Sequence, residues 1–229
     1  MAILNGILRL KGTIGELNFV NIGQTIRVRR KRGTVKPATI NNKFRQNVDR
    51  NDRVMKTGKP IFRIIKEYAE SKRLGRFWPN MLGRLRTCSD DNLETQLQSL
   101  KDLEINIKHQ LSERVIVEGY TLHNDQDHFM VELKLKSHAI FEDEDVDCYY
   151  YELITILWDK DEGITQYTSI PTHWIYHTDD EPKGIIKFER TNWEKYYLLI
   201  LRLQGGKEGK VSDFVPDRAM AILGGGILD

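Results

Sequence analysis

The hydrophobic period of this chain changes near Leu103, and the change separates a helical part from an extended part. Between residues 40 and 100, apolar side chains recur at spacings of three and four, as in Ile61, Ile64 and Tyr68, which is typical of amphipathic helices. After Leu103 they alternate with polar residues in roughly eight short runs separated by Asp, Gly and Asn, which is typical of antiparallel strands. The sequence therefore predicts an α+β fold in which an antiparallel β-sandwich follows a short helical region.

The first 36 residues predict a β-hairpin, with strands near residues 13–20 and 25–30. The second strand alternates apolar and basic residues, so the two kinds lie on opposite faces: Ile26 and Val28 on one, Arg27 and Arg29 on the other. Two strands alone are marginally stable in water. We therefore expect this hairpin to lie on the helices of its own chain or on another subunit.

Helix signals and breaks give the expected domain layout. Thr39 is a suitable N-cap, Gly58-Lys59-Pro60 predicts the end of the first helix, and a second helix is expected from Ile61 to about Ser71. A third helix is expected from near Pro79 to Arg86, and the polar run 89–92 predicts the cap of a fourth helix. The expected domains are a hairpin arm over 1–36, a basic helical region over 37–101, and a sandwich with a flexible C-terminal tip over 102–229.

Charge is sorted along the chain. Residues 1–87 hold 21 Lys/Arg against five Asp/Glu, whereas residues 88–229 hold 14 against 28. A split of this size indicates a partner surface rather than a requirement of the fold. Two partners fit: nucleic acid, or the acidic half of the chain, either in the same copy or in a neighbouring one.

The basic stretch of the hairpin is the strongest candidate for a partner-binding site, because clustered cations neutralise phosphates or acidic protein surfaces. Its expected electrostatic contacts are Arg27, Arg29, Arg30, Lys31, Arg32 and Lys36, and its expected apolar contacts are Phe19, Ile26 and Val28. Aromatic residues are poorly interleaved with the basic ones, which argues against stacking on single-stranded nucleic acid.

The C-terminus is a second candidate. Gly224-Gly225-Gly226 predicts a flexible linker before the apolar pair Ile227 and Leu228. The end is either frayed or a hook that docks this pair on a neighbour.

No pattern of catalytic or metal-ligating residues stands out. The chain lacks a phosphate-binding loop, a nucleophile elbow and a zinc-protease motif, so we expect no enzyme activity and no cofactor. His173 and His177 lie too far apart along a strand for one metal, and the acidic runs 142–147 and 159–163 are interpreted as solvated loops, with weak cation sites as the alternative.

Other sequence features concern the cellular setting. Cys88 and Cys148 are expected to be separate thiols in a reducing compartment, with a disulfide as the alternative. The sequence shows neither a convincing signal peptide nor an apolar run long enough to span a membrane. We expect a protein of the cytoplasm or of an assembled particle.

The N-terminal residues also resemble a known family. Gly12-Thr13-Ile14-Gly15-Glu16-Leu17-Asn18-Phe19, followed by Gly23-Gln24 and Ile26-Arg27, is similar to the opening of small uncharacterised proteins of Bacteroidota. Phe44-Arg45, Gly75-Arg76, Leu82-Gly83-Arg84-Leu85 and Leu103-Glu104-Ile105-Asn106 extend the resemblance over roughly the first 107 residues, and Trp78-Pro79-Asn80 departs from it. The resemblance supports this layout, and it implies a structural or mobile-element component without indicating any chemistry.

Taken with the charge split, these features predict a non-enzymatic assembly protein that contacts copies of itself or other subunits through its basic arm. The setting would be a virion-like particle, a filament or a secretion-related complex. The alternative is a nucleic-acid-binding module that uses the same arginines.

Overall fold

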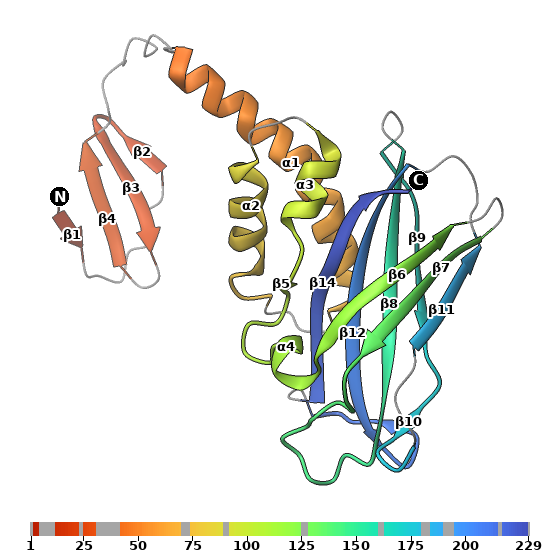
Figure 1. Ribbon diagram of the computed structural model, residues 1–229. Coiled ribbons are helices and arrows are strands. Elements are labelled where there is room, and N and C mark those ends of the chain that lie inside the picture. Colours follow the sequence, from red (N-terminus) through yellow and green to blue (C-terminus); the bar gives the residue numbers. More distant parts are fainter. Residues whose placement is uncertain are drawn as a thin grey trace. The chain divides into compact units, whose positions relative to one another are not determined.

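The chain is α+β, as expected, with an N-terminal antiparallel sheet, a helical region and two further antiparallel sheets (Figure 1). It divides into two compact units, Met1–Asn47 and Val48–Asp229. The computed structural model describes residues 2–4, 12–22, 25–30, 42–69, 74–88, 92–124, 128–159, 163–179, 184–189, 195–214 and 217–228.

The N-terminal unit contains a four-stranded antiparallel sheet rather than a single hairpin. Its order is β1-β4-β3-β2. The strand expected near residues 13–20 is divided by a turn at Gly15, whose φ of 56° lies in the left-handed region that glycine adopts at no steric cost. The expected second strand is confirmed. The bounds are Ala2–Leu4 (β1), Gly12–Ile14 (β2), Leu17–Ile22 (β3) and Thr25–Arg30 (β4).

The first long helix does not end at Gly58-Lys59-Pro60, where the sequence predicted a break. Helix α1 runs from Asn42 to Tyr68 with Pro60 inside it. An interior proline costs about 3 kcal/mol, but Ile61 and Ile65 are fully buried just beyond it, and each such burial contributes about 1.5–3 kcal/mol. Gly58 helps, since a Cβ there would lie only 3.3 Å from side-chain atoms of α2. Packing therefore outweighs the local break signal.

The later helices confirm the expected third and fourth helical segments. Helix α2 spans Phe77–Thr87 and α3 spans Leu93–Ser99, and a further single turn, α4, spans Leu111–Arg114. The Asn92 side chain caps α3 by accepting a hydrogen bond of 3.0 Å from the Glu94 N–H. No helix in the described ranges is both long enough and apolar enough to cross a membrane.

Two antiparallel sheets make up the β part of the larger unit. The seven-stranded sheet has the strand order β10-β8-β12-β14-β5, and in addition β9 pairs with β8 and β13 pairs with β12. The three-stranded sheet has the order β11-β7-β6. The bounds of the first are Leu103–Glu104 (β5), Cys148–Asp159 (β8), Gly163–Pro171 (β9), Ile175–Tyr176 (β10), Tyr196–Lys207 (β12), Lys210–Val211 (β13) and Arg218–Ile227 (β14). Those of the second are Val117–Asn124 (β6), His128–Leu135 (β7) and Gly184–Glu189 (β11).

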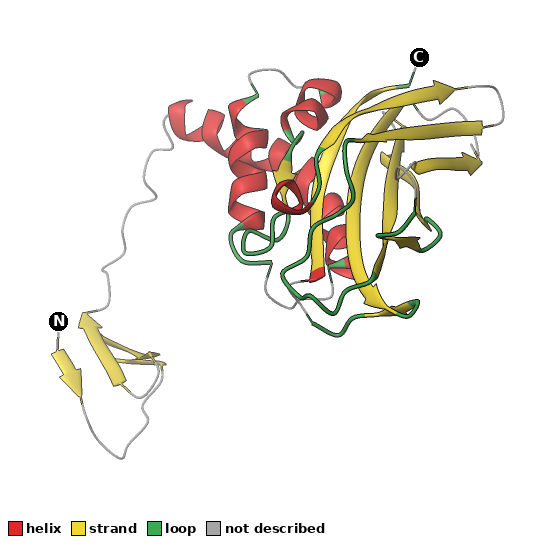
Figure 2. Ribbon diagram, turned by 60° about the horizontal axis from the view of Figure 1, so that its bottom comes forward, coloured by secondary structure: helices red, strands yellow, loops and turns green. Residues whose placement is uncertain are grey.

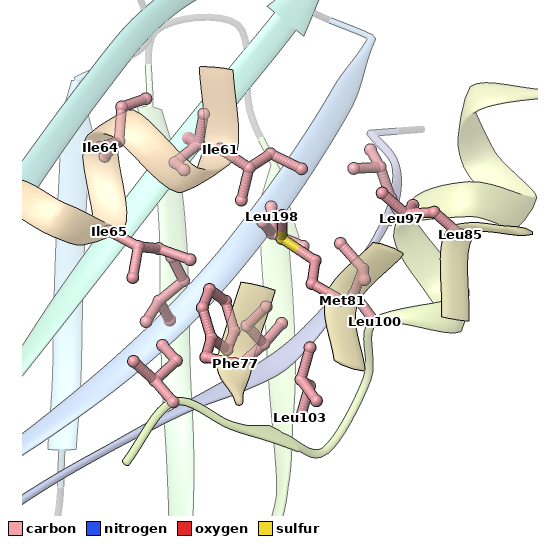
Figure 3. Packing of buried hydrophobic residues seen from close by; sticks show 14 of the residues in the cluster. Ile61, Ile64, Ile65, Phe77, Met81, Leu85, Leu97, Leu100, Leu103 and Leu198 are labelled. Atoms are coloured by element: carbon pink, nitrogen blue, oxygen red, sulfur yellow. The ribbon is translucent and has the colours of Figure 1, made fainter. Parts of the chain in front are cut away.

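The seven-stranded sheet is covered on both faces, by helices on one and by the smaller sheet on the other (Figure 2). Successive residues of a strand point to opposite faces, so one apolar run supplies two cores. In β8, Leu153 and Leu157 pack in the core that includes β7, whereas Ile154 and Ile156 pack in the core that includes the helices. Figure 3 shows the helical core, where side chains of α1, α2 and α3 meet those of β12: Ile61, Ile65, Phe77, Met81, Leu97 and Leu198.

This shared core explains why the units differ from the expected domains. The sequence analysis placed boundaries after residues 36 and 101, whereas the chain divides between Asn47 and Val48. The apolar faces of the helices have no separate core, because they are buried against the sheet that follows them in the sequence.

The C-terminal glycines form a packed strand and not a flexible linker. Gly224, Gly225 and Gly226 lie in β14 opposite Leu199, Leu198 and Tyr197 of β12. Leu228 is only 8% exposed and belongs to the core of its own chain. The flexible tip expected from the glycine run is therefore wrong. Gly224 and Gly225 fit where other residues approach the strand too closely for a side chain.

Candidate docking face of the N-terminal sheet

The N-terminal sheet presents an apolar face to solvent. Ile14 pairs with Leu17, and Phe19 pairs with Val28, and paired residues of neighbouring strands share a face. Leu17 and Phe19 are two apart in β3 and lie on that face as well. Ile14 is 61% exposed and Leu17 is 44% exposed, while Phe19 and Val28 are half-buried. These four residues form what we call the apolar face.

The opposite side of the same sheet is basic. Arg27 and Arg29 flank Val28 in β4, so they point away from the apolar face, and both are exposed. Arg29 pairs with the half-buried Asn18 of β3. This confirms the predicted division of Val28 from Arg27 and Arg29, and we call Arg27, Arg29 and Asn18 the basic face.

Arg30 lies at the end of β4, where its Nε is 3.2 Å from a carboxylate oxygen of Glu16. Both side chains are about four-fifths exposed, and an ion pair in water contributes about 0–1 kcal/mol. The pair therefore leaves Arg30 available to a stronger partner.

The other predicted contact residues are placed only in part. Ile26 lies in β4 opposite Asn21, and its side chain lies outside the described residues, as do Lys31, Arg32 and Lys36 entirely. Ile227 and Leu228 belong to the larger unit; Ile227 is 40% exposed and Leu228 is buried. A C-terminal hook built on Leu228 is therefore ruled out in this fold.

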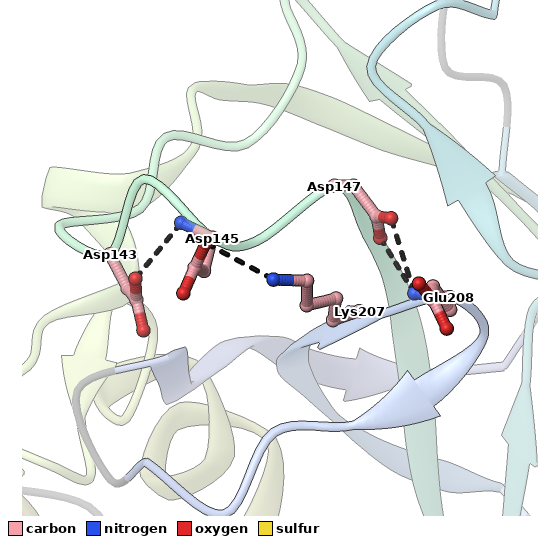
Figure 4. A network of polar contacts seen from close by, with 5 residues as sticks. All are labelled: Asp143, Asp145, Asp147, Lys207 and Glu208. Carbon is pink, nitrogen blue, oxygen red and sulfur yellow. Dashed lines mark hydrogen bonds and ion pairs between the residues drawn. The ribbon is translucent and has the colours of Figure 1, made fainter.

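The larger unit carries a concentration of carboxylates at one end. Asp143 accepts a hydrogen bond of 2.9 Å from the Asp145 N–H, and Asp145 is 3.1 Å from Lys207 Nζ. Both oxygens of Asp147 accept from the Glu208 N–H, at 3.0 and 3.2 Å (Figure 4). We call the carboxylates of this loop the acidic end: Glu142, Asp143, Glu144, Asp145 and Asp147.

These contacts shift two pKa values in directions that keep the groups charged. Hydrogen bonds with Cys148 and with the Glu208 N–H lower the pKa of Asp147. The hydrogen bond to Asp145 raises the pKa of Lys207. Among these carboxylates, Asp145 pairs with Lys207 and Glu142 pairs with Arg114 at 2.6 Å. The five carboxylates outnumber these two cations, so the loop keeps a net negative charge.

Exposed apolar residues gather near the same carboxylates. Asp143, Asp145 and Val211 line a hollow of about 430 Å³, and Val211 is 43% exposed. Ile140, two residues before Glu142, is 65% exposed, and Phe214, in the segment after β13, is 51% exposed. This surface was not expected from the sequence, because the acidic run 142–147 was interpreted as a solvated loop. The apolar pair Ile140-Phe141 directly before the run was the available signal.

Nothing in the described ranges forms a cluster of three or more metal-ligating side chains. His173 and His177 flank the short strand β10, and His177 Nε2 is 3.1 Å from the Ala139 carbonyl oxygen. Cys88 and Cys148 are free thiols, as expected. These residues form structural contacts within the unit.

No protein-family model, curated protein or solved structure matches the chain. The resemblance to Bacteroidota proteins in the first 107 residues stays a prediction.

Proposed function

We propose that the chain is a non-enzymatic subunit of a larger assembly, and that its N-terminal sheet binds a neighbouring copy. The observation that carries this proposal is the apolar face of Ile14, Leu17, Phe19 and Val28, which the described residues leave open to water. Burial of exposed apolar surface is favourable, and exposed apolar patches mark interaction sites. A neighbouring subunit provides that burial.

Charge favours a second copy as the neighbour. Residues 1–47 hold ten Lys/Arg against one Glu, a net charge of +9, so residues 48–229 hold 25 against 32, a net charge of −7. Opposite potentials steer association and suppress other partners. The acidic end has the complementary composition, since exposed Ile140, Val211 and Phe214 accompany its carboxylates.

A contact between the sheet of one copy and the acidic end of the next joins two different surfaces. Such heterologous contacts generate a closed ring when the rotation between copies closes and an open filament when it does not. The proposal therefore predicts association that continues beyond a dimer.

A charge exchange tests this contact. Arg30 pairs with Leu17 and therefore lies on the same side of the sheet as the apolar face. Arg30→Glu, or Glu144→Lys with Asp145→Lys, is expected to reduce association by at least about tenfold, because each places like charges together. A mixture of the two variants is expected to associate again. Mass is measured by light scattering over a range of protein concentration at about 50 mM salt, where screening is weak.

A matched control changes charge elsewhere. Lys101→Glu with Lys108→Glu alters two exposed lysines of the larger unit and is expected to leave association unchanged. Failure of the mixture to associate, with each of the two variants impaired, would place the partner surface elsewhere. A wild-type chain that stays monomeric at every concentration would refute the assembly function itself.

Nucleic-acid binding is the second candidate, and the basic face favours it. Arg27 and Arg29 lie on the side of β4 away from the apolar face, so they are able to contact phosphates while the apolar face is occupied. Phosphate contacts predict affinity that falls steeply with salt. Replacing Arg27, Arg29, Arg30 and Arg32 with Ala is expected to abolish duplex DNA binding in an electrophoretic shift; unchanged binding would exclude this candidate.

A further inference from the structure

A cavity of about 650 Å³ lies in the larger unit, away from the surfaces discussed above. It is walled by α1 and α3 and by the end of the seven-stranded sheet where β8 finishes and β9 and β12 begin. The volume falls within the range of about 300–1,000 Å³ that is typical of small-molecule sites. Neither the N-terminal sheet nor the acidic end contributes to its lining.

A largely buried residue with an amide group lines this cavity. Gln96, on α3, lines the cavity and is only 6% exposed. Its Oε1 accepts a hydrogen bond of 2.7 Å from Thr57 Oγ1, which fixes the orientation of the amide group. Its Nε2 makes no hydrogen bond to the described part of the chain. Because Gln96 lines the cavity, this donor is available to an acceptor bound there.

The charge of the lining indicates which acceptor fits. Arg53 and Lys56 lie on the cavity wall formed by α1, three residues apart and therefore adjacent on the helix surface. Asp159 is the one acidic residue among the described residues of the lining. Within the described lining, two cations are therefore accompanied by one carboxylate. Together with the donor of Gln96, this charge favours an anion.

The remaining lining is apolar and partly aromatic. Trp158 is 4% exposed at the end of β8, and Tyr196 and Ile164 lie at the starts of neighbouring strands. Flat apolar side chains of this kind offer a surface on which a ring packs. The cavity thus combines a positively charged rim with an aromatic base.

We propose that this cavity binds an aromatic organic anion. Its carboxylate lies between Arg53 and Lys56, its ring packs on Trp158 and Tyr196, and an oxygen of the ligand accepts from Gln96 Nε2. This binding site is independent of the proposed assembly function, because no residue of the apolar, basic or acidic surfaces takes part.

Calorimetric titration of the full chain with naphthalene-2-carboxylate tests the proposal. We expect saturable binding at one site, and we expect Lys56→Glu to weaken it by at least about tenfold because a charge-assisted contact is replaced by repulsion. Lys59→Glu makes the same charge change on the same helix outside the cavity, and we expect it to bind as the wild type does.

A second variant tests the amide. Gln96→Glu keeps an oxygen that accepts from Thr57 and replaces the donor with an acceptor, so we expect it to abolish binding while circular dichroism and the unfolding transition show a folded chain. The neutral naphthalene-2-carboxamide is expected to bind at least about tenfold more weakly than the carboxylate. Absence of saturable binding to the wild type, or equal affinities for Lys56→Glu and Lys59→Glu, would overturn the proposal.

Discussion

Replacing Gly225 with alanine is expected to destabilise the larger unit. A Cβ at this position would lie 2.8 Å from the backbone oxygen of Tyr197 and 3.0 Å from the Cβ of Leu97, which belongs to α3. Neither atom is the end of a flexible side chain, so the strand or the helix has to move. Overpacking of a well-packed core costs about 1–3 kcal/mol, and we expect a loss of this size.

The neighbouring Gly226 provides a matched control. A Cβ there would meet the ring of Tyr197 at 3.5–3.7 Å, which is ordinary contact. Both substitutions reduce the entropy of the unfolded chain by the same amount, a stabilisation of about 0.4–1 kcal/mol. The difference between Gly225→Ala and Gly226→Ala therefore isolates the cost of the clash.

Urea denaturation followed by circular dichroism measures that difference. For a domain of this size, each kcal/mol lost lowers the thermal midpoint by about 2–4 °C, so a thermal scan provides a second readout. Equal free energies of unfolding for the two alanine variants would refute the packed strand and restore the flexible C-terminal linker that the glycine run suggested.

Two further predictions concern single side chains near the acidic end. The pKa of Asp147 is lowered in the folded state. Its contribution to stability is therefore present above its unfolded pKa of about 3.9 and is lost as pH falls through the lower folded value. In urea titrations we expect Asp147→Asn to be less stable than the wild type at pH 7 and equal to it at about pH 2, and a difference that stays constant with pH would contradict this. Burial raises the pKa of the Cys148 thiol to about 11, so a disulfide reagent at about pH 8 is expected to modify this thiol only after unfolding. In that experiment, Cys148→Ser should leave the native-state labelling unchanged, and a native wild-type chain that reacts at Cys148 would contradict the burial.

Local chemistry in the sequence was sufficient for several elements of the fold. The alternation of β4 assigned Val28 and its flanking arginines to opposite faces, and the polar run before α3 contained its cap, Asn92. In each case the deciding interaction lies within a few residues of the signal, so the sequence contains the whole of it.

Two features could not be predicted in this way, because tertiary packing overrides the local sequence signal. Pro60 lies inside α1 because Ile61 and Ile65 are buried against strands more than 80 residues away. The glycines of β14 look like a linker until α3 and β12 are seen to approach Gly225 closely. Local propensity indicates a break in both places, and long-range contacts decide against it.

Of the two surfaces in the proposed contact, only the N-terminal sheet was predictable from the sequence. The arginines and apolar residues of the N-terminal sheet follow from alternation within β4, whereas the surface that complements them joins the loop before β8 to the segment after β12. Asp143 and Val211 are 68 positions apart in the sequence and line the same hollow only because β8 pairs with β12.

The mass of the full chain after size exclusion, measured by light scattering at about 50 mM and about 500 mM salt, tests the central claim most directly. The absorbance ratio at 260 and 280 nm is recorded on the same peak. We expect a protein-only species heavier than the 26.8 kDa monomer at low salt, and a shift toward monomer at high salt. A mass of 26.8 kDa at both salt concentrations and at every protein concentration would contradict assembly through the N-terminal sheet, and a monomer with salt-sensitive 260 nm absorbance would favour nucleic-acid binding.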